Sequence, residues 1–197
     1  MSQFWNERFA STSYVYGTEP NEFLKTELEK LSPGKILFPG EGEGRNAVYA
    51  ARLGWEVTAF DSSLQGKQKA DRLAKSQNVR IDYQIASYEA AQFPADTFDC
   101  IALVFTHMPA DKRNGYHQRF LQWLKPGGSL LLEGFSKEQI RYSSGGPKEV
   151  TMLWSADELA KDFEVLSQFS SQLVETDLHE GDFHRGKAAV IRATGTR

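Results

Sequence analysis

Hydrophobic and polar positions fall into blocks along this chain that predict strands and helices in turn. Short apolar runs bounded by turn residues are typical of strands, and longer stretches with apolar residues three or four positions apart are typical of helices. The predicted strands are Ile36–Phe38, Trp55–Phe60, Val79–Ile85, Phe98–Phe105, Ser129–Phe135, about Glu164–Thr176 and Lys187–Thr194. The predicted helices run from Asn21 to about Leu31, from Arg45 to Leu53, from Ser62 or Ser63 to about Gln77, from Pro109 to Lys125, and onward from Ser155. This alternation favours a doubly wound α/β sheet.

Capping residues support several of these boundaries. Asn21 and Ser155 are good N-caps, and Gly54 is a good helix terminator. The run Lys125–Gly128 reads KPGG and predicts a turn into the next strand. The polar segment between the last two strands is too short for a helix, so we expect those strands to pair antiparallel.

A glycine-rich loop follows the first predicted strand. The apolar run stops at Pro39, and Gly40, Gly42 and Gly44 follow at alternate positions before a helix begins. The next strand closes on Asp61. The order strand, glycine loop, helix, strand, carboxylate predicts a nucleoside-binding unit, in which backbone approaches the ligand and the acid accepts hydrogen bonds from ribose hydroxyls.

The glycine spacing distinguishes between nucleoside cofactors. A dinucleotide fingerprint has glycine at its first, third and sixth positions, and the sixth position counted from Gly40 is Arg45. The pattern is GxGxG instead, which resembles motif I of the class I S-adenosylmethionine-dependent methyltransferases. An NAD(P)-dependent oxidoreductase is therefore the less favoured alternative.

The resemblance to these methyltransferases extends over nearly the whole chain. The run LKPGGSLLLEGF (Leu124–Phe135) looks like the family's turn into strand five, and the terminal hairpin looks like its strands six and seven. The opening WNERFASTSYVYGTEPNEFL resembles small bacterial methyltransferases related to the tellurite-resistance and thiopurine enzymes. The resemblance implies one Rossmann-like domain with a seven-stranded sheet of order 3-2-1-4-5-7-6 and strand seven antiparallel. Its parts would be an N-terminal lid and helix (1–31), a cofactor-binding core (32–135), and an acceptor loop with the terminal hairpin (136–197).

Two positions depart from the family pattern. Phe38 stands where many members have an acid, and Glu41 and Glu43 are candidates to replace that acid. Ser87, before Tyr88, stands where an acid often contacts the adenine amino group. The missing acid leaves open a non-catalytic S-adenosylmethionine-binding module. The residues predicted to bind the cofactor are Tyr16, Gly40, Glu41, Gly42, Gly44, Arg45, Asp61, Ser62, Ser87 and Tyr88.

The N-terminal segment from Trp5 to Pro20 is rich in aromatic residues and contains Gly17 and Pro20 as candidate hinges. In the enzymes that it resembles, such a segment closes over the cofactor as a lid. The alternative interpretation is simple core packing.

The candidate acceptor residues are His107, Arg141, His184 and Arg185. His107 follows the fourth strand, where it is either a general base or a turn residue. The two arginines favour an anionic small-molecule acceptor. The resemblance to tellurite-resistance and thiopurine enzymes implies a small, soft acceptor such as a thiol or a chalcogen oxyanion, and a metabolite hydroxyl or carboxylate is left open. We expect His117 to lie on the surface. His179 and His184 have no firm third ligand, so no metal is predicted.

Composition narrows the function classes. The 197 residues are 40% hydrophobic and 25% charged, with a net charge of −3, which fits one globular domain and argues against a nucleic-acid binder. Cys100 is the only cysteine, which excludes an internal disulfide and a cysteine zinc cluster, and it sits in a core-like strand. No apolar run approaches the ~20 residues that span a bilayer. We expect a cytoplasmic monomer without a membrane or nucleic-acid partner.

Overall fold

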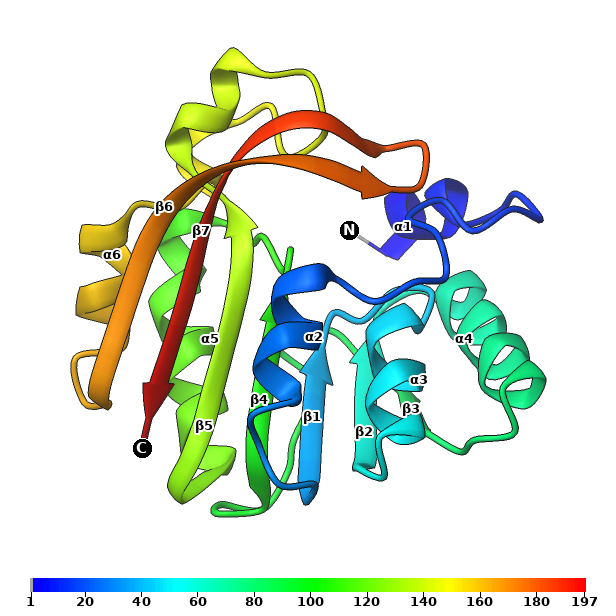
Figure 1. Ribbon diagram of the computed structural model, residues 1–197, viewed down its shortest axis with the longest axis horizontal. Helices are drawn as coiled ribbons and strands as arrows, with labels where there is room; N and C mark the ends of the chain where they lie inside the picture. Colours follow the sequence, from blue (N-terminus) through cyan, green and yellow to red (C-terminus); the bar gives the residue numbers. More distant parts are fainter. Residues whose placement is uncertain (1) are drawn as a thin grey trace.

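The computed structural model describes residues 2–197 and contains one seven-stranded sheet in the order β3-β2-β1-β4-β5-β7-β6 (Figure 1). The strands are β1 (Lys35–Pro39), β2 (Glu56–Asp61), β3 (Asp82–Ile85), β4 (Phe98–Val104), β5 (Leu124–Phe135), β6 (Ser167–Glu180) and β7 (His184–Thr196). The α-helices are α1 (Ser2–Arg8), α2 (Glu22–Leu28), α3 (Arg45–Arg52), α4 (Leu64–Ser76), α5 (Ala110–Trp123) and α6 (Ala156–Asp162). Two short 3-10 helices, η1 (Lys137–Arg141) and η2 (Val150–Met152), follow β5. The predicted domain begins at Met1, which lies outside the described residues.

Strand direction agrees with the predicted topology. The pairs β1–β2, β2–β3, β1–β4 and β4–β5 are parallel, and β7 is antiparallel to both β5 and β6. The predicted sheet order and the antiparallel seventh strand are confirmed. A dehydrogenase-like sheet of six parallel strands is excluded, which removes the main structural support for the oxidoreductase alternative.

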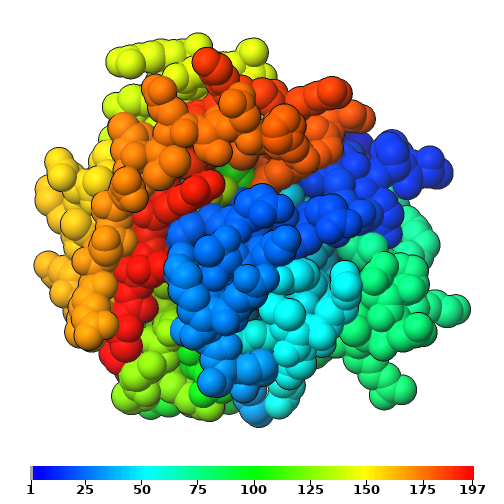
Figure 2. Space-filling view, viewed as in Figure 1, coloured from blue at the N-terminus to red at the C-terminus, as the bar shows by residue number. Residues whose placement is uncertain are grey.

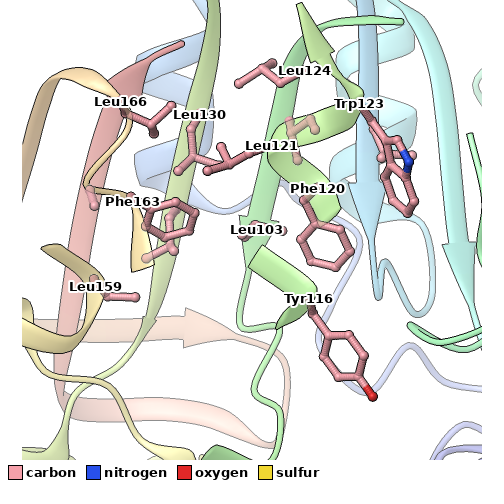
Figure 3. Close-up of a cluster of buried hydrophobic side chains, with 14 of the residues drawn as sticks. Leu103, Tyr116, Phe120, Leu121, Trp123, Leu124, Leu130, Leu159, Phe163 and Leu166 are labelled. Atoms are coloured by element: carbon pink, nitrogen blue, oxygen red, sulfur yellow. The ribbon is translucent and has the colours of Figure 1, made fainter. Parts of the chain in front are cut away.

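Helices cover both faces of the sheet because residues along each buried strand alternate between the two faces. Ile36 and Phe38 of β1 pack with side chains of α2 and α3, whereas Leu37 packs on the opposite face with α5 and α6. Figure 3 shows part of this second cluster, with Phe120 of α5 and Phe163, the C-cap of α6, among its members. Cys100 is fully buried, as predicted for a core residue.

The predicted caps are found in the structure. The Asn21 side chain accepts a hydrogen bond from the Leu24 backbone, although α2 ends three residues earlier than predicted, at Leu28. Ser63, rather than Ser62, caps α4. Ser155 and Glu158 form a reciprocal capping box at the start of α6.

The segment predicted as the KPGG turn belongs to β5. The β4–β5 register shifts between Phe98 and Cys100, which face Leu124 and Ser129 respectively. Residues 125–128 therefore form a long bulge opposite Asp99, whose carboxylate accepts a hydrogen bond from Lys125 at 2.6 Å. A bulge keeps the strand paired on both sides while it absorbs the extra residues.

The terminal hairpin is longer than predicted. Its strands continue to Glu180 and His184, so most of the polar segment that was predicted to separate them is strand. Figure 1 shows the hairpin curving past the end of the sheet toward α1. Polar residues are tolerated there because much of this extension faces solvent rather than the core.

The prediction of a surface position for His117 is wrong. Its side chain is fully buried in α5, its ring stacks on Phe163, and Nδ1 lies 2.9 Å from a carboxylate oxygen of Asp162. Helical spacing explains the placement, since Arg113, His117 and Phe120 follow one another at four and three positions on the inner side of α5. Along residues 2–197, the helices are too short or too polar to cross a membrane.

Candidate active site

A cavity of about 450 Å³ lies at the carboxyl ends of β1, β2 and β4, under the N-terminal segment and the tip of the β6–β7 hairpin. Ligands bind at this edge of open α/β sheets because loops from several strands meet there. The sequence-predicted residues that line it are Tyr16, Gly40, Glu41, Gly42, Arg45, Asp61, Ser62, Ser87, Tyr88, His107 and His184. Its volume is within the usual range for a small-molecule site.

The glycine loop brings backbone to the cavity wall. Gly40 and Gly42 have φ of +65° and +64°, a region that disfavours a side chain. The backbone N–H groups of Gly40 and Glu41 both donate to the Phe60 carbonyl, at 2.7 and 3.2 Å. A Cβ on Gly40 would lie 2.4 Å from the Tyr88 hydroxyl. Glycine is therefore required at this close approach of backbone to cavity.

Asp61 ends β2 with its carboxylate at the cavity wall. One oxygen accepts a hydrogen bond from the Gly42 N–H at 3.2 Å, and the other accepts one from the Ser63 N–H at 2.8 Å. Burial raises the pKa of Asp61 to about 6, although these backbone donors oppose the shift. Each oxygen keeps a lone pair for a further donor, which fits ligand hydroxyls.

Glu41 supplies a carboxylate close to the position where the family acid is missing. Phe38 packs in the core beneath α2 and α3, so it cannot do this work. Glu41 accepts hydrogen bonds from the N–H groups of Asn46 and Ala47, at 2.9 and 2.8 Å, at the start of α3. Burial raises the pKa of Glu41 to about 7, partly offset by these bonds and by Arg45. A cationic ligand group beside Glu41 would favour its ionised form, because a nearby positive charge lowers the pKa of a carboxyl group.

Glu43 holds the N-terminal segment over the cavity. Its carboxylate accepts hydrogen bonds from the N–H groups of Val15 and Tyr16, at 3.1 and 3.2 Å, and pairs with Lys69 of α4 at 2.7 Å. Lys69 also donates to the Ser13 carbonyl at 2.6 Å. Figure 2 shows the N-terminal segment in blue, lying against the orange and red hairpin. The lid function remains a prediction, and residues 13–16 are its anchored part.

Gly44 does not line the cavity, in contrast to its predicted role in cofactor binding. It is the N-cap of α3, and a Cβ there would lie 2.5 Å from the Ala70 Cβ. Its role in the structure is the close packing of α3 against α4.

His107 lines the cavity as predicted, but its ring is fully engaged with backbone. Nε2 accepts a hydrogen bond from the Phe135 N–H at 3.0 Å, so Nδ1 carries the proton and donates to the Met152 carbonyl at 2.9 Å. Burial lowers the pKa of His107 to about 4, against the opposing effect of the Met152 bond. With no free lone pair, the ring does not fit the predicted role of general base. Its other predicted role, as a turn residue, fits this geometry.

Arg141 and Arg185 are exposed and do not line the cavity, so their predicted place in the pocket wall is wrong. Arg141 lies at the end of η1. Arg185 follows His184 in β7, and successive strand residues point to opposite faces. His184 faces inward, and its neighbour therefore points to solvent.

His184 lies in a group of aromatic rings that sequence reasoning did not assemble. Its ring centroid is 4.5 Å from that of Tyr16 and 4.4 Å from that of Phe105. Its Nδ1 lies 3.1 Å from a carboxylate oxygen of Glu180, the residue opposite it in the hairpin. Phe105 carries backbone strain that only the structure reveals, with φ of +53° immediately after β4. The sequence feature that could have linked Glu180 to His184 is its position four residues earlier in the chain.

Comparisons with known proteins agree with the fold. Residues 36–128 match the family described as "Methyltransferase domain". Phosphoethanolamine N-methyltransferase 3 from Arabidopsis thaliana is 28% identical over 135 residues, which are 68% of this chain and 27% of that protein. The chain thus spans little more than a quarter of that relative's length.

Two solved structures share the fold across the whole chain. The N-methyltransferase NodS from Bradyrhizobium japonicum, in complex with S-adenosyl-L-homocysteine, has a TM-score of 0.74 at 14% identity, covering 100% of this chain and 97% of that one. TehB from Haemophilus influenzae has a TM-score of 0.72 at 18% identity, covering 100% of this chain and 66% of that one.

The fold is therefore that of the class I S-adenosylmethionine-dependent methyltransferases, and residues 36–128 are similar to the methyltransferase-domain family. S-adenosylmethionine is the cofactor of this class, as the sequence predicted. The finer resemblance to tellurite-resistance and thiopurine enzymes is not confirmed, because 18% identity to TehB shows the fold alone.

Proposed function

We propose that this protein transfers a methyl group from S-adenosylmethionine to a small-molecule acceptor. The observation that carries the proposal is the buried Asp61 carboxylate at the wall of the cavity, beside the positive-φ glycines Gly40 and Gly42. When bound, the cofactor supplies an electrophilic methyl group on a sulfonium.

The donor set of the cavity fits this cofactor. Asp61 would accept hydrogen bonds from the ribose hydroxyls, and Ser87 and Tyr88 would line the adenine side. Glu41 would face the cationic amino-acid end and replace the acid missing at Phe38. Removing water and holding the acceptor close to the methyl group are the main contributions a protein makes to such a transfer.

The acceptor is better described as aromatic or weakly polar than as anionic. Arg45, the arginine among the cavity-lining residues, is paired with Glu180 at 2.8 Å. Lys112, at the rim, is paired with Glu89 at 3.0 Å. The cavity also presents the rings of Phe9, Tyr16 and Phe105, while the two arginines that favoured an anion lie outside it. Of the predicted acceptors, a thiol or hydroxyl on a small apolar body fits best.

Calorimetry with S-adenosylmethionine and with NAD tests the cofactor assignment. We expect binding of the first alone, and Asp61→Ala should weaken it by about 1.5–3 kcal/mol, the cost of losing charge-assisted hydrogen bonds. Equal affinity in a folded Asp61→Ala protein would contradict the assignment. A coupled assay for S-adenosylhomocysteine across a panel of thiols, phenols, amines and carboxylates then separates an enzyme from a non-catalytic binding module.

A further inference from the structure

The four histidines of the chain differ in what their ring nitrogens can do. His107 uses both nitrogens on backbone groups. His117 bonds Asp162 through Nδ1, and its Nε2 is enclosed without a partner. His179 is exposed on β6, away from the cavity. His184 alone among them lines the cavity with a carboxylate on one nitrogen and no protein partner on the other in the described chain.

The partner of His184 decides its tautomer. An ionised carboxylate can only accept, so Nδ1 of the neutral ring carries the proton and donates to Glu180. Glu180 also accepts hydrogen bonds from Arg45 at 2.8 Å and from Asn21 at 2.9 Å. Arg45 and His184 outweigh burial and lower the pKa of Glu180 to about 2, so the carboxylate stays charged. In the neutral ring, Nε2 is consequently left with a free lone pair.

The surroundings of His184 keep this lone pair available at neutral pH. Burial lowers the pKa of His184, Arg45 and Arg8 act in the same direction, and Glu180 opposes them. The remaining neighbours are the uncharged rings of Tyr16, Phe105 and Phe135, with His107 beyond them. His184 is 7% exposed and lines the cavity, so its ring is largely buried but still accessible from the cavity.

We propose that His184 is the general base that removes the acceptor's proton, with Glu180 as the residue that positions it. This inference rests on the proposed function. The acceptor's X–H bond breaks, its proton goes to Nε2, and the electron pair stays on X. That pair forms the new bond to the methyl carbon, while the carbon–sulfur pair returns to sulfur. The imidazolium that results is stabilised by the Glu180 carboxylate.

The test uses the full chain with His184→Gln and Glu180→Gln, and His179→Gln serves as the matched control on the same hairpin. Nitrogen-15 NMR of the ligand-free protein reports the tautomer of His184 without any turnover. Calorimetry gives the affinity for S-adenosylmethionine, and the coupled assay gives kcat against pH for the best acceptor of the panel.

We expect the proton on Nδ1 in the wild type, and turnover of His184→Gln reduced by about 10²–10⁴, the usual contribution of a general base. Its affinity for S-adenosylmethionine should stay within about twofold, which also shows that it is folded. Glu180→Gln should lower kcat and move the acid limb of the pH profile to lower pH, because the carboxylate raises the pKa of His184. His179→Gln should match the wild type.

Wild-type turnover and pH profile in His184→Gln, or a proton found on Nε2, would overturn the base assignment and leave the methyltransferase proposal intact. A wild-type protein that binds no S-adenosylmethionine, or that converts no acceptor, overturns the proposed function itself. The base assignment then falls with it.

Discussion

Replacing Lys69 by methionine removes one side of the buried ion pair that anchors the N-terminal segment. Lys69 is 1% exposed and Glu43 is 4% exposed, and the two side chains meet at 2.7 Å. The change keeps the apolar stem of Lys69 and removes its charge. Glu43 is left with the N–H groups of Val15 and Tyr16 as its hydrogen-bond donors.

Breaking a buried pair from one side costs about 3–5 kcal/mol, because the remaining charge is left in a medium of low polarity. The two backbone donors to Glu43 offset part of that cost, so we expect about 3 kcal/mol. This is a large share of the roughly 5–15 kcal/mol that stabilises a typical domain. We also expect weaker binding of S-adenosylmethionine, because Tyr16 lines the cavity next to the lost anchor.

Urea unfolding followed by circular dichroism measures the loss. Lys67→Met is the matched control: Lys67 lies one half-turn away on α4 and pairs with Asp71 at 2.9 Å at the surface. An exposed pair four residues apart contributes only about 0.3–0.5 kcal/mol. Adding Glu43→Gln to Lys69→Met should recover part of the stability, because it removes the unpaired charge. A Lys69→Met protein as stable as Lys67→Met would refute this account of the pair.

Three further predictions concern titration and packing. Affinity for S-adenosylmethionine should be about tenfold weaker at pH 5 than at pH 8, because the pKa of Asp61 is about 6 and the ribose hydroxyls need the carboxylate form. Calorimetry across this pH range measures the change, and an affinity that does not depend on pH would contradict it. The measurement is repeated in Glu41→Gln, which lacks the other cavity carboxyl that titrates near this range. The stability of the ligand-free protein should depend on pH in the opposite direction. Because folding raises the pKa of Asp61, this carboxyl contributes to the free energy of unfolding below about pH 4, and the contribution is lost as the pH rises through 6. Free energies of unfolding measured against pH test this. His107→Ala should lower the unfolding free energy by about 1–3 kcal/mol, since the Phe135 N–H loses its acceptor. Its kcat should fall far less than that of His184→Gln, and a loss of about 10² or more at unchanged stability would restore His107 as the base.

Local patterns in the sequence determined most of the fold. Apolar periodicity placed each strand of the sheet, and the caps at Asn21 and Ser155 marked helix starts, because these features depend on residues only a few positions apart. The same holds for the glycine loop and Asp61, which are brought together by a single strand–helix–strand unit. The family resemblance then supplied the strand order, which local pattern does not contain.

Tertiary structure alone decided which side chains share the cavity and what each can do there. His107 is occupied by backbone groups 28 and 45 positions away, so its availability depends on how β5 and η2 pack. The free nitrogen of His184 depends on the length of the hairpin, which sets Glu180 opposite it and turns Arg185 outward. The sequence pattern predicts which face of a helix or strand is buried. The protonation and hydrogen bonding of a buried polar group depend on partners from distant segments of the chain. Their distances are known only after the chain has packed.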